Sequence, residues 1–182
     1  MSRIPAPALE HLPVASQTLL ASVVSQFGTV PNVFRIIANS PAALEAFVGC
    51  YSALGKCGLD RLTRERIALA VAEANGSDYC LSLQTFRVRQ AAILDDIEIT
   101  ANRSGASNDI TADAAVRFAA RLARERGRVG DADFETMRRA GYADADIVEV
   151  IATVAINVFA NIVNIALQTD IDFPRIAARR TG

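Results

Sequence analysis

The apolar residues of this chain recur every three or four positions, which is the repeat of helices that bury one face. No alternating pattern long enough for a strand interrupts them, and the glycines lie mainly between the periodic segments. The pattern predicts an all-α fold, a bundle of about eight helices. One of its stripes consists of Leu19, Leu20, Val23, Val24 and Phe27.

Residues that favour helix starts divide the chain further. Ser40-Pro41 combines a capping hydroxyl with a proline in the first helical position, and Thr63 is expected to cap the next helix. Asn75-Gly76 should end that helix, and Ser77 or Asp78 should start another one. Further helices are expected at about residues 95–103, 111–127, 131–140 and 144–168.

The last of these helices is the most apolar part of the chain, but it contains amides. Asn157, Asn161, Asn164 and Gln168 lie on one helix face. Three asparagines in a bilayer core would be costly, so this pattern predicts a buried helix rather than a membrane span. The amides could line a pocket opposite Glu73, or they could form hydrogen bonds across a subunit contact.

Length and composition limit the classes of function that this protein can have. A chain of 182 residues suits one domain, 1–182, and its formal net charge of −1 gives no reason to expect nucleic acid or an anionic membrane as partner. No secretory leader is visible, so we expect a cytoplasmic protein whose three cysteines are thiols. His11 and Lys56 are the sole His and Lys, and general-base chemistry would therefore fall to a carboxylate or a thiolate.

The segment 73–84, EANGSDYCLSLQ, carries the candidate chemistry. With Ser77 or Asp78 as cap, Cys80 lies in the first helical turn, where free amide groups and the helix dipole favour a thiolate. The carboxylate of Asp78 would oppose that effect. Gln84 follows four residues later on the same face, where it can donate a hydrogen bond but cannot shuttle a proton. Glu73 reaches Cys80 only if the two helices fold together suitably.

Each of these residues also has a purely structural interpretation. Cys80 could be a small buried apolar side chain, and Ser77 is better explained as a cap than as a nucleophile, because no His is at hand to activate it. Glu73 could be a proton relay or the partner of an arginine in a buried ion pair.

Four segments together resemble a known family. They are FGTVPNVFR, NSPAALEAF, LTRERIALAVAEANGSDYCLSLQT and NVFANIVNIALQTDIDFP, and they cover about residues 27–174. Their order is similar to that of the alkyl hydroperoxidase D-like, carboxymuconolactone decarboxylase superfamily, in particular its peroxidase-related branch. The resemblance implies a helical homo-oligomer, a trimer or hexamer, that acts on a small hydroperoxide or a carboxylated molecule.

In active peroxidase relatives, the second Cys of a CxxC motif attacks peroxide and the first resolves the product, while a Glu and a His relay protons. By position, the resemblance implies Cys80 as the attacking thiol and Glu73 as the relay. Ser77 replaces the resolving Cys, and Gln84 replaces the His. An oxidised Cys80 would therefore need an external thiol reductant, or else Cys50 or Cys57 brought near by folding.

Three functions follow as expectations. The first is a thiol-dependent, peroxidase-related antioxidant oxidoreductase that works with one cysteine or with reduced activity. The second is a cofactor-free acid/base decarboxylase or lactone-processing enzyme, and the third is a non-catalytic oligomeric binding protein. The expected pocket residues are Asn75, Tyr79, Asn157 and Asn161, with no metal and no cofactor.

Overall fold

The computed structural model describes residues 2–179, and of Ser22, Gln26 and Phe27 it describes only the backbone. The predicted place of Phe27 in an apolar stripe and the ends of the predicted domain thus lie outside the described residues. Within them the chain is all-helical, with nine α-helices and one short 3₁₀ turn, which confirms the predicted fold class. In chain order these are η1 (Leu9–His11), α1 (Val14–Phe27), α2 (Asn32–Ile37), α3 (Pro41–Leu54), α4 (Arg61–Ala74), α5 (Asp78–Gln90), α6 (Asp96–Arg103), α7 (Ile110–Arg124), α8 (Asp131–Arg139) and α9 (Asp144–Leu167).

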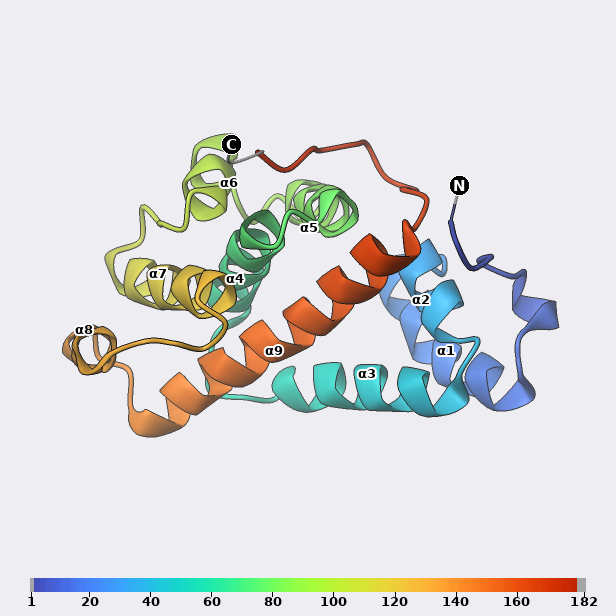
Figure 1. Cartoon of the computed structure of the whole chain (residues 1–182), viewed down its shortest axis with the longest axis horizontal. Coiled ribbons are helices and arrows are strands. Elements are labelled where there is room, and N and C mark those ends of the chain that lie inside the picture. The colour runs from blue at the N-terminus through green and yellow to red at the C-terminus, as the bar shows by residue number, and fades with distance from the viewer. Residues whose placement is uncertain (1, 180–182) are drawn as a thin grey trace.

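Helix α4 lies at the centre of the bundle and packs against α5, α6, α7 and α9 (Figure 1). The long helix α9 runs diagonally across the molecule and contacts helices on both sides of α4, from α2 and α3 to α7 and α8. After α9 the chain continues without regular structure above α5 toward α6 (Figure 1). We call residues 170–179 the C-terminal strap.

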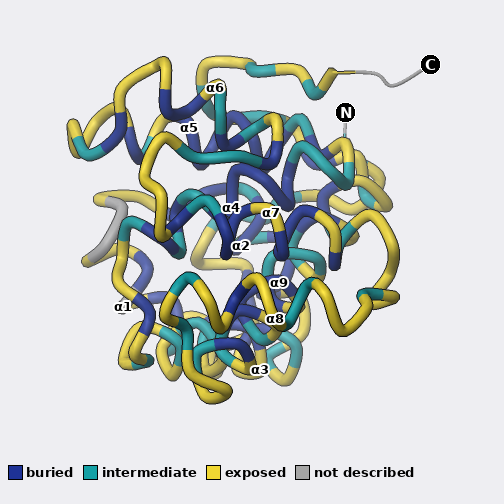
Figure 2. Tube along the Cα trace, turned by 90° about the vertical axis from the view of Figure 1, so that its left-hand side faces the viewer, coloured by how far each residue is buried: buried dark blue, intermediate teal, exposed yellow. Residues whose placement is uncertain are grey.

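Apolar side chains from these helices form two main clusters beneath a mostly exposed outer surface (Figure 2). One cluster joins α1, α2 and α3 to α5, and the other joins α4, α7 and α8. Helix α9 contributes to both, with Ile156 in the first and Val150 and Val154 in the second. Full burial of such a side chain is worth about 1.5–3 kcal/mol, so α9 ties the two halves together through its apolar contacts.

The predicted helix starts are confirmed at two positions and wrong at a third. Ser40 caps α3 by accepting a hydrogen bond from the Ala43 amide, and Ser77 caps α5. Helix α4, however, is capped by Asp60, whose Oδ1 accepts from the Thr63 amide at 2.9 Å. Thr63 is therefore not the cap. Asp caps helices at least as well as Thr does. Because Asp60 lies three residues before Thr63, α4 starts almost a full turn earlier than predicted.

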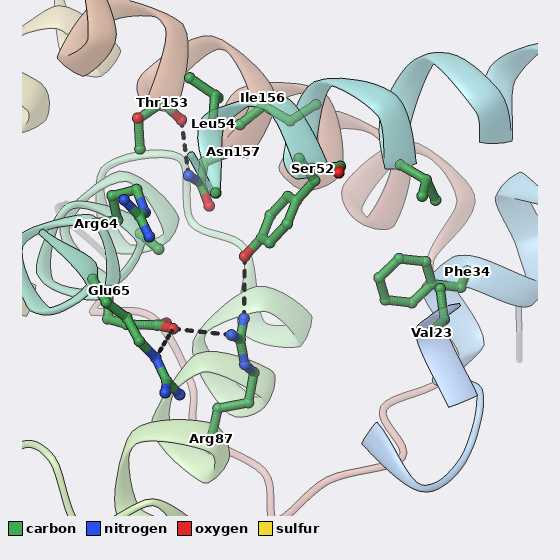
Figure 3. Close-up of a pocket in the computed structure, with 15 residues that line it drawn as sticks. Val23, Phe34, Ser52, Leu54, Arg64, Glu65, Arg87, Thr153, Ile156 and Asn157 are labelled. Atoms are coloured by element: carbon green, nitrogen blue, oxygen red, sulfur yellow. Dashed lines mark hydrogen bonds and ion pairs between the residues drawn. The ribbon is translucent and has the colours of Figure 1, made fainter. Parts of the chain in front are cut away.

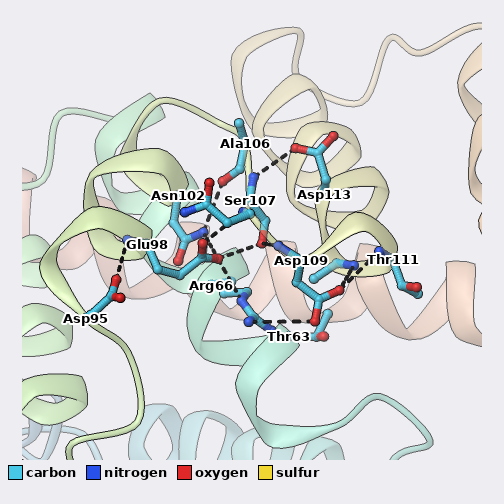
Figure 4. Close-up of polar contacts among 12 residues, drawn as sticks. Thr63, Arg66, Asp95, Glu98, Asn102, Ala106, Ser107, Asp109, Thr111 and Asp113 are labelled. Carbon is cyan, nitrogen blue, oxygen red and sulfur yellow. Dashed lines mark hydrogen bonds and ion pairs between the residues drawn. The ribbon is translucent and has the colours of Figure 1, made fainter.

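A buried carboxylate fastens α6 to α4 and to the loop before α7 (Figure 4). Glu98 Oε1 accepts hydrogen bonds from Arg66 Nε at 2.9 Å, Asn102 Nδ2 at 2.8 Å and Ser107 Oγ at 2.5 Å, and its Oε2 accepts from the Asn108 amide at 2.8 Å. Burial alone would raise the pKa of Glu98, but these hydrogen bonds outweigh it and lower the pKa from 4.5 to about 2. The ionised form is thus the one that the fold stabilises.

Replacement of Glu98 by Gln should destabilise the protein by roughly 2–3 kcal/mol at pH 7, because the folded state then loses the preference for the carboxylate. The native pKa is depressed, so this stability is fully present above pH 4.5 and is lost as the pH falls toward 2. Urea unfolding of wild type and Glu98→Gln at several pH values measures the effect, and the difference should shrink across that window. Glu45→Gln, at an exposed position of α3, is the matched control. A Glu98→Gln variant as stable as this control at pH 7 would contradict the prediction.

Candidate functional site

Cys80 lies in the first turn of α5, as the sequence predicts. The Ser77 hydroxyl accepts a hydrogen bond from the Cys80 amide at 3.4 Å, and the thiol sulfur accepts one from Asn164 Nδ2 of α9 at 3.3 Å. The residue is only 6% exposed and belongs to the apolar cluster that contains Phe34 and Ile156. The sulfur is thus held between a helix start, one amide group and hydrocarbon.

This environment favours the neutral thiol of Cys80, whereas the sequence predicts a thiolate. Burial raises the pKa of Cys80, and the hydrogen bonds from Ser77 and Asn164 reduce that rise without cancelling it. The removal of a charge from water outweighs the helix dipole, because the favourable effect of a helix terminus amounts to only about 0.3–1 kcal/mol at most sites. The structure therefore shows Cys80 as a buried thiol with one amide donor.

Glu73 forms a buried ion pair with an arginine, which is one of the two roles that the sequence allows for it. Its Oε2 accepts from Arg103 Nε at 2.6 Å, and its Oε1 accepts from the backbone amide of Arg179 at 2.6 Å. The side chain is 7% exposed and fastens α6 and the C-terminal strap to the end of α4. With each oxygen already engaged, this carboxylate is occupied by structural contacts.

Two other residues of the segment 73–84, Tyr79 and Asn75, lie next to the C-terminal strap. The Tyr79 hydroxyl donates to Asp172 Oδ1 at 2.8 Å and accepts from the Val33 amide at 3.1 Å, so it joins α5 to α2 and the strap. Asn75 ends α4, and its Nδ2 is buried without a hydrogen-bond partner in the described residues. Both residues line a cavity under the strap together with Glu73 and Ser77. We call this space the C-terminal cavity.

The amides of α9 turn inward. Asn161 Nδ2 donates to the Val71 carbonyl of α4 at 3.3 Å, Asn164 contacts Cys80, and Asn157 Nδ2 donates to the Thr153 carbonyl one turn earlier at 2.8 Å. Asn157 lines a second cavity, and Asn164 lines the C-terminal cavity. Of this face, Asn164 and Gln168 line the cavity that also contains Glu73, whereas Asn157 lines a different cavity and Asn161 connects two helices.

Gln84 takes part in a different polar group from Cys80. Its Oε1 accepts a hydrogen bond from Arg87 Nη1 at 3.3 Å. Arg87 also donates from Nη2 to Glu65 Oε1 at 2.9 Å and from Nη1 to the Tyr51 hydroxyl at 3.1 Å. These bonds join α3, α4 and α5 through one guanidinium group.

This group lies on a cavity of about 360 Å³ between α3, α4, α5 and α9, in which the side chains of Glu65, Arg87 and Asn157 point toward the open space (Figure 3). We call it the central cavity. Glu65 is 6% exposed, and its Oε1 also lies 3.9 Å from Arg61 Nε. The remaining walls are mainly apolar, and the lining residues are Val23, Phe34, Val48, Tyr51, Ser52, Leu54, Gly55, Arg61, Arg64, Glu65, Ala68, Arg87, Thr153, Ile156 and Asn157.

Comparisons with known proteins agree with this architecture. Residues 41–125 match the carboxymuconolactone decarboxylase family. A peroxidase-related protein with an alkylhydroperoxidase core from Ralstonia eutropha is 28% identical, with a TM-score of 0.81 over 94% of this chain and 92% of that one. A peroxidase-related protein from a Silicibacter species is also 28% identical, with a TM-score of 0.78 over 92% of this chain and 88% of that one. The chain is thus similar to the alkyl hydroperoxidase D-like, carboxymuconolactone decarboxylase superfamily.

A more distant likeness shows the fold alone. The debrominase Bmp8 in complex with 2,3,4-tribromopyrrole is 20% identical, with a TM-score of 0.74 over 86% of this chain and 84% of that one. No curated protein matches the chain at a significant level.

Sequence reasoning missed Glu65, Arg87 and Tyr51, although the signal for Glu65 was present. Ala68 and Ala72 follow it at positions i+3 and i+7 of α4, so small side chains on one helix face leave room beside a carboxylate. Among residues 2–179 there is no group of three or more His, Cys, Asp or Glu side chains arranged to hold a metal ion.

The buried thiol should react slowly with an alkylating agent. We expect iodoacetamide at pH 8 to label Cys80 at least tenfold more slowly than the exposed Cys50, because both burial and the raised pKa of Cys80 reduce the accessible thiolate. Peptide mass spectrometry over time measures the two labelling rates. Complete unfolding in concentrated urea should remove the difference between them. Equal labelling of Cys50 and Cys80 in the native protein would contradict this prediction.

Proposed function

We propose that this protein is an acid/base enzyme whose reaction takes place in the central cavity, on a small and mainly apolar carboxylated molecule. The observation that carries the proposal is the polar group on the cavity wall, in which Arg87 joins Glu65 to Tyr51. A carboxylate beside a guanidinium group in an otherwise apolar space combines a proton carrier with a group that stabilises negative charge. The match to the carboxymuconolactone decarboxylase family supports the same class of substrate.

The side chains suit the steps of a decarboxylation. Arg61 and Arg64 line the cavity and can attract the carboxylate of an entering molecule. Loss of CO₂ breaks the bond between the carboxyl carbon and the ring, and the electron pair moves onto a conjugated lactone carbonyl as an enolate. The Tyr51 hydroxyl accepts a hydrogen bond from Arg87 and retains its own proton, through which it donates a hydrogen bond to that enolate oxygen. Glu65 then carries a proton from water to the ring carbon, which completes the exchange of CO₂ for H⁺.

Release of CO₂ from carboxymuconolactone tests the proposal. Glu65→Gln should reduce kcat by about 10²–10⁴-fold, since proton transfer by a positioned side chain contributes that much. Cys80→Ala should keep turnover, because the thiol does not line the central cavity. Glu45→Gln controls for the loss of a carboxylate elsewhere. An unchanged rate in Glu65→Gln, or loss of turnover in Cys80→Ala, would overturn it.

A second candidate is a one-cysteine hydroperoxide reductase. It is favoured by the Asn164 donor on the Cys80 sulfur and by the two peroxidase-related structures at 28% identity. The Cys80 thiolate would attack the distal oxygen, release an alcohol and become a sulfenic acid, which an external thiol would reduce, because Ser77 cannot form a disulfide. Trapping of a Cys80 sulfenic acid with dimedone after treatment with cumene hydroperoxide tests it. A folded protein that forms no such adduct excludes this candidate.

The exposed face of α9 supports assembly with further copies of the chain. Helix α9 is long and apolar enough to cross a membrane by length and composition, although its amide face packs inside this fold. Large apolar side chains cover much of its other face, among them Ile162 with 60% exposure. These exposed residues are Val148, Ile151, Phe159, Ile162 and Ile165. Their spacing forms a stripe that a second copy can cover, so we infer a cytoplasmic homo-oligomer, with a trimer or hexamer as the expected size.

Ile162→Asp should convert the oligomer into monomers at micromolar concentration, because it places a charge in the proposed contact. The molar mass from light scattering after size-exclusion chromatography measures the change. Ile110→Asp alters an isoleucine at the start of α7 that is even more exposed, at 91%, and should leave the mass unchanged. A wild-type monomer, or an Ile162→Asp variant of unchanged mass, would contradict the assembly through α9.

A further inference from the structure

The central cavity has two chemically different ends. The side chains of Arg64, Glu65 and Arg87 lie on one side of the open space (Figure 3). Those of Val23 and Phe34 lie on the other side. The charged residues belong to α4 and α5, and the apolar ones belong to α1 and α2. A molecule that fills the cavity therefore meets charged groups at one end and hydrocarbon at the other.

The charged end has an excess of positive charge. Arg61, Arg64 and Arg87 line the cavity together with one carboxylate, that of Glu65. The side chain of Arg61 is 64% exposed, whereas that of Arg87 is 15% exposed, so the guanidinium groups lead from solvent into the cavity. A carboxylate is thus attracted to this end, where guanidinium groups bind it through strong, charge-assisted hydrogen bonds.

The opposite end consists of hydrocarbon side chains. Val23 and Phe34 are 4% and 9% exposed, and they belong to one apolar core cluster with Ile156, which also lines the cavity. Val48 of α3 is half-buried, packs against the same cluster and lines the cavity as well. None of these four side chains can form a hydrogen bond or pair with a charge. This end therefore favours an uncharged hydrocarbon group and rejects a second carboxylate.

We infer that the substrate of the central cavity is a carboxylate with a single uncharged hydrocarbon chain. Its carboxylate binds at the arginines, and its chain lies against Val23, Phe34 and Val48. Liquid water occupies about 30 Å³ per molecule, so a cavity of about 360 Å³ holds roughly twelve non-hydrogen atoms, close to a carboxylate with a chain of about eight carbons. This substrate class rests on the function proposed above and adds to it the part of the molecule that does not react.

Val48 is the residue that limits the length of the chain. Tyr51, whose hydroxyl accepts a hydrogen bond from Arg87, follows Val48 by three positions and lies on the same face of α3. A chain that starts near Arg87 and follows this face passes Tyr51 and reaches Val48 about one helical turn later. Since Val48 has no polar group, a change in its size alters the room for the chain and leaves the charged end intact.

Isothermal titration calorimetry with straight-chain carboxylates tests this substrate class. From butanoate to octanoate the affinity should rise about fourfold for each added CH₂, the effect of about 0.8 kcal/mol, and dodecanoate should gain nothing further. Suberate carries a carboxylate at each end of a chain of the same number of carbons, and octylammonium carries a positive head. Each should bind at least about tenfold more weakly than octanoate.

Two substitutions of Val48 test its role. Val48→Phe should weaken octanoate binding about tenfold and leave butanoate binding unchanged, because the added ring fills the apolar end. Val48→Ala enlarges that end and should make decanoate a better ligand than octanoate. Ala46→Phe places the same ring at an exposed position of α3 outside the cavity, and it should bind both carboxylates as the wild type does. Thermal melting checks that each variant is folded.

An affinity that does not rise with chain length would overturn the inference, as would suberate or octylammonium that binds as tightly as octanoate. Equal effects of Val48→Phe and Ala46→Phe would overturn it too. These are binding measurements, so they are separate from the turnover of Glu65→Gln. A flat chain-length series with turnover that depends on Glu65 overturns the substrate class alone, whereas the expected series with unchanged turnover in Glu65→Gln overturns the reaction alone.

Discussion

The link between α4 and α5 determines how the start of α5 meets α9 and the C-terminal strap. Helix α4 ends at Asn75, Gly76 adopts a φ of 69°, and Ser77 starts α5. A left-handed backbone angle is easily reached by glycine and strained for other residues, so this three-residue link, residues 75–77, depends on the glycine. Because the chain turns here, the start of α5 faces α9, and the ends of α4 and α9 form the walls of a cavity under the strap.

The same turn explains the state of Cys80. A helix start provides free amide groups, but the Cys80 amide is already bonded to Ser77, and α9 packs over the sulfur with one amide and several apolar side chains. The local sequence indicates the dipole and the cap, whereas the desolvation comes from a helix some eighty residues away. Two effects of opposite sign thus act on one thiol, and only the three-dimensional packing shows that burial is the larger.

The sequence predicts features that depend on residues close together in the chain, and it cannot predict contacts between residues that lie far apart in it. Helix periodicity and the caps Ser40 and Ser77 are local, and they were predictable to within about one turn. Even the inward amide face of α9 could be identified from spacing. The partners of Glu73 could not, because Arg103 and Arg179 lie 30 and 106 positions away. Those contacts turn a candidate relay into a structural anchor, and the family order of segments gives no indication of them.

Gln84, which stands where the resemblance places a His, has a structural role of its own, because its side chain contacts Arg87. Gln84 Oε1 accepts a hydrogen bond from Arg87, which simultaneously donates to Glu65 and Tyr51. An imidazolium at this position would place a second positive charge beside the guanidinium group, and a neutral imidazole offers one acceptor only in one tautomer. An amide oxygen accepts from Arg87 at every pH. Gln84 therefore accepts from the same guanidinium group that binds Glu65 on the central cavity, and Ser77 has no sulfur with which to form a disulfide to Cys80.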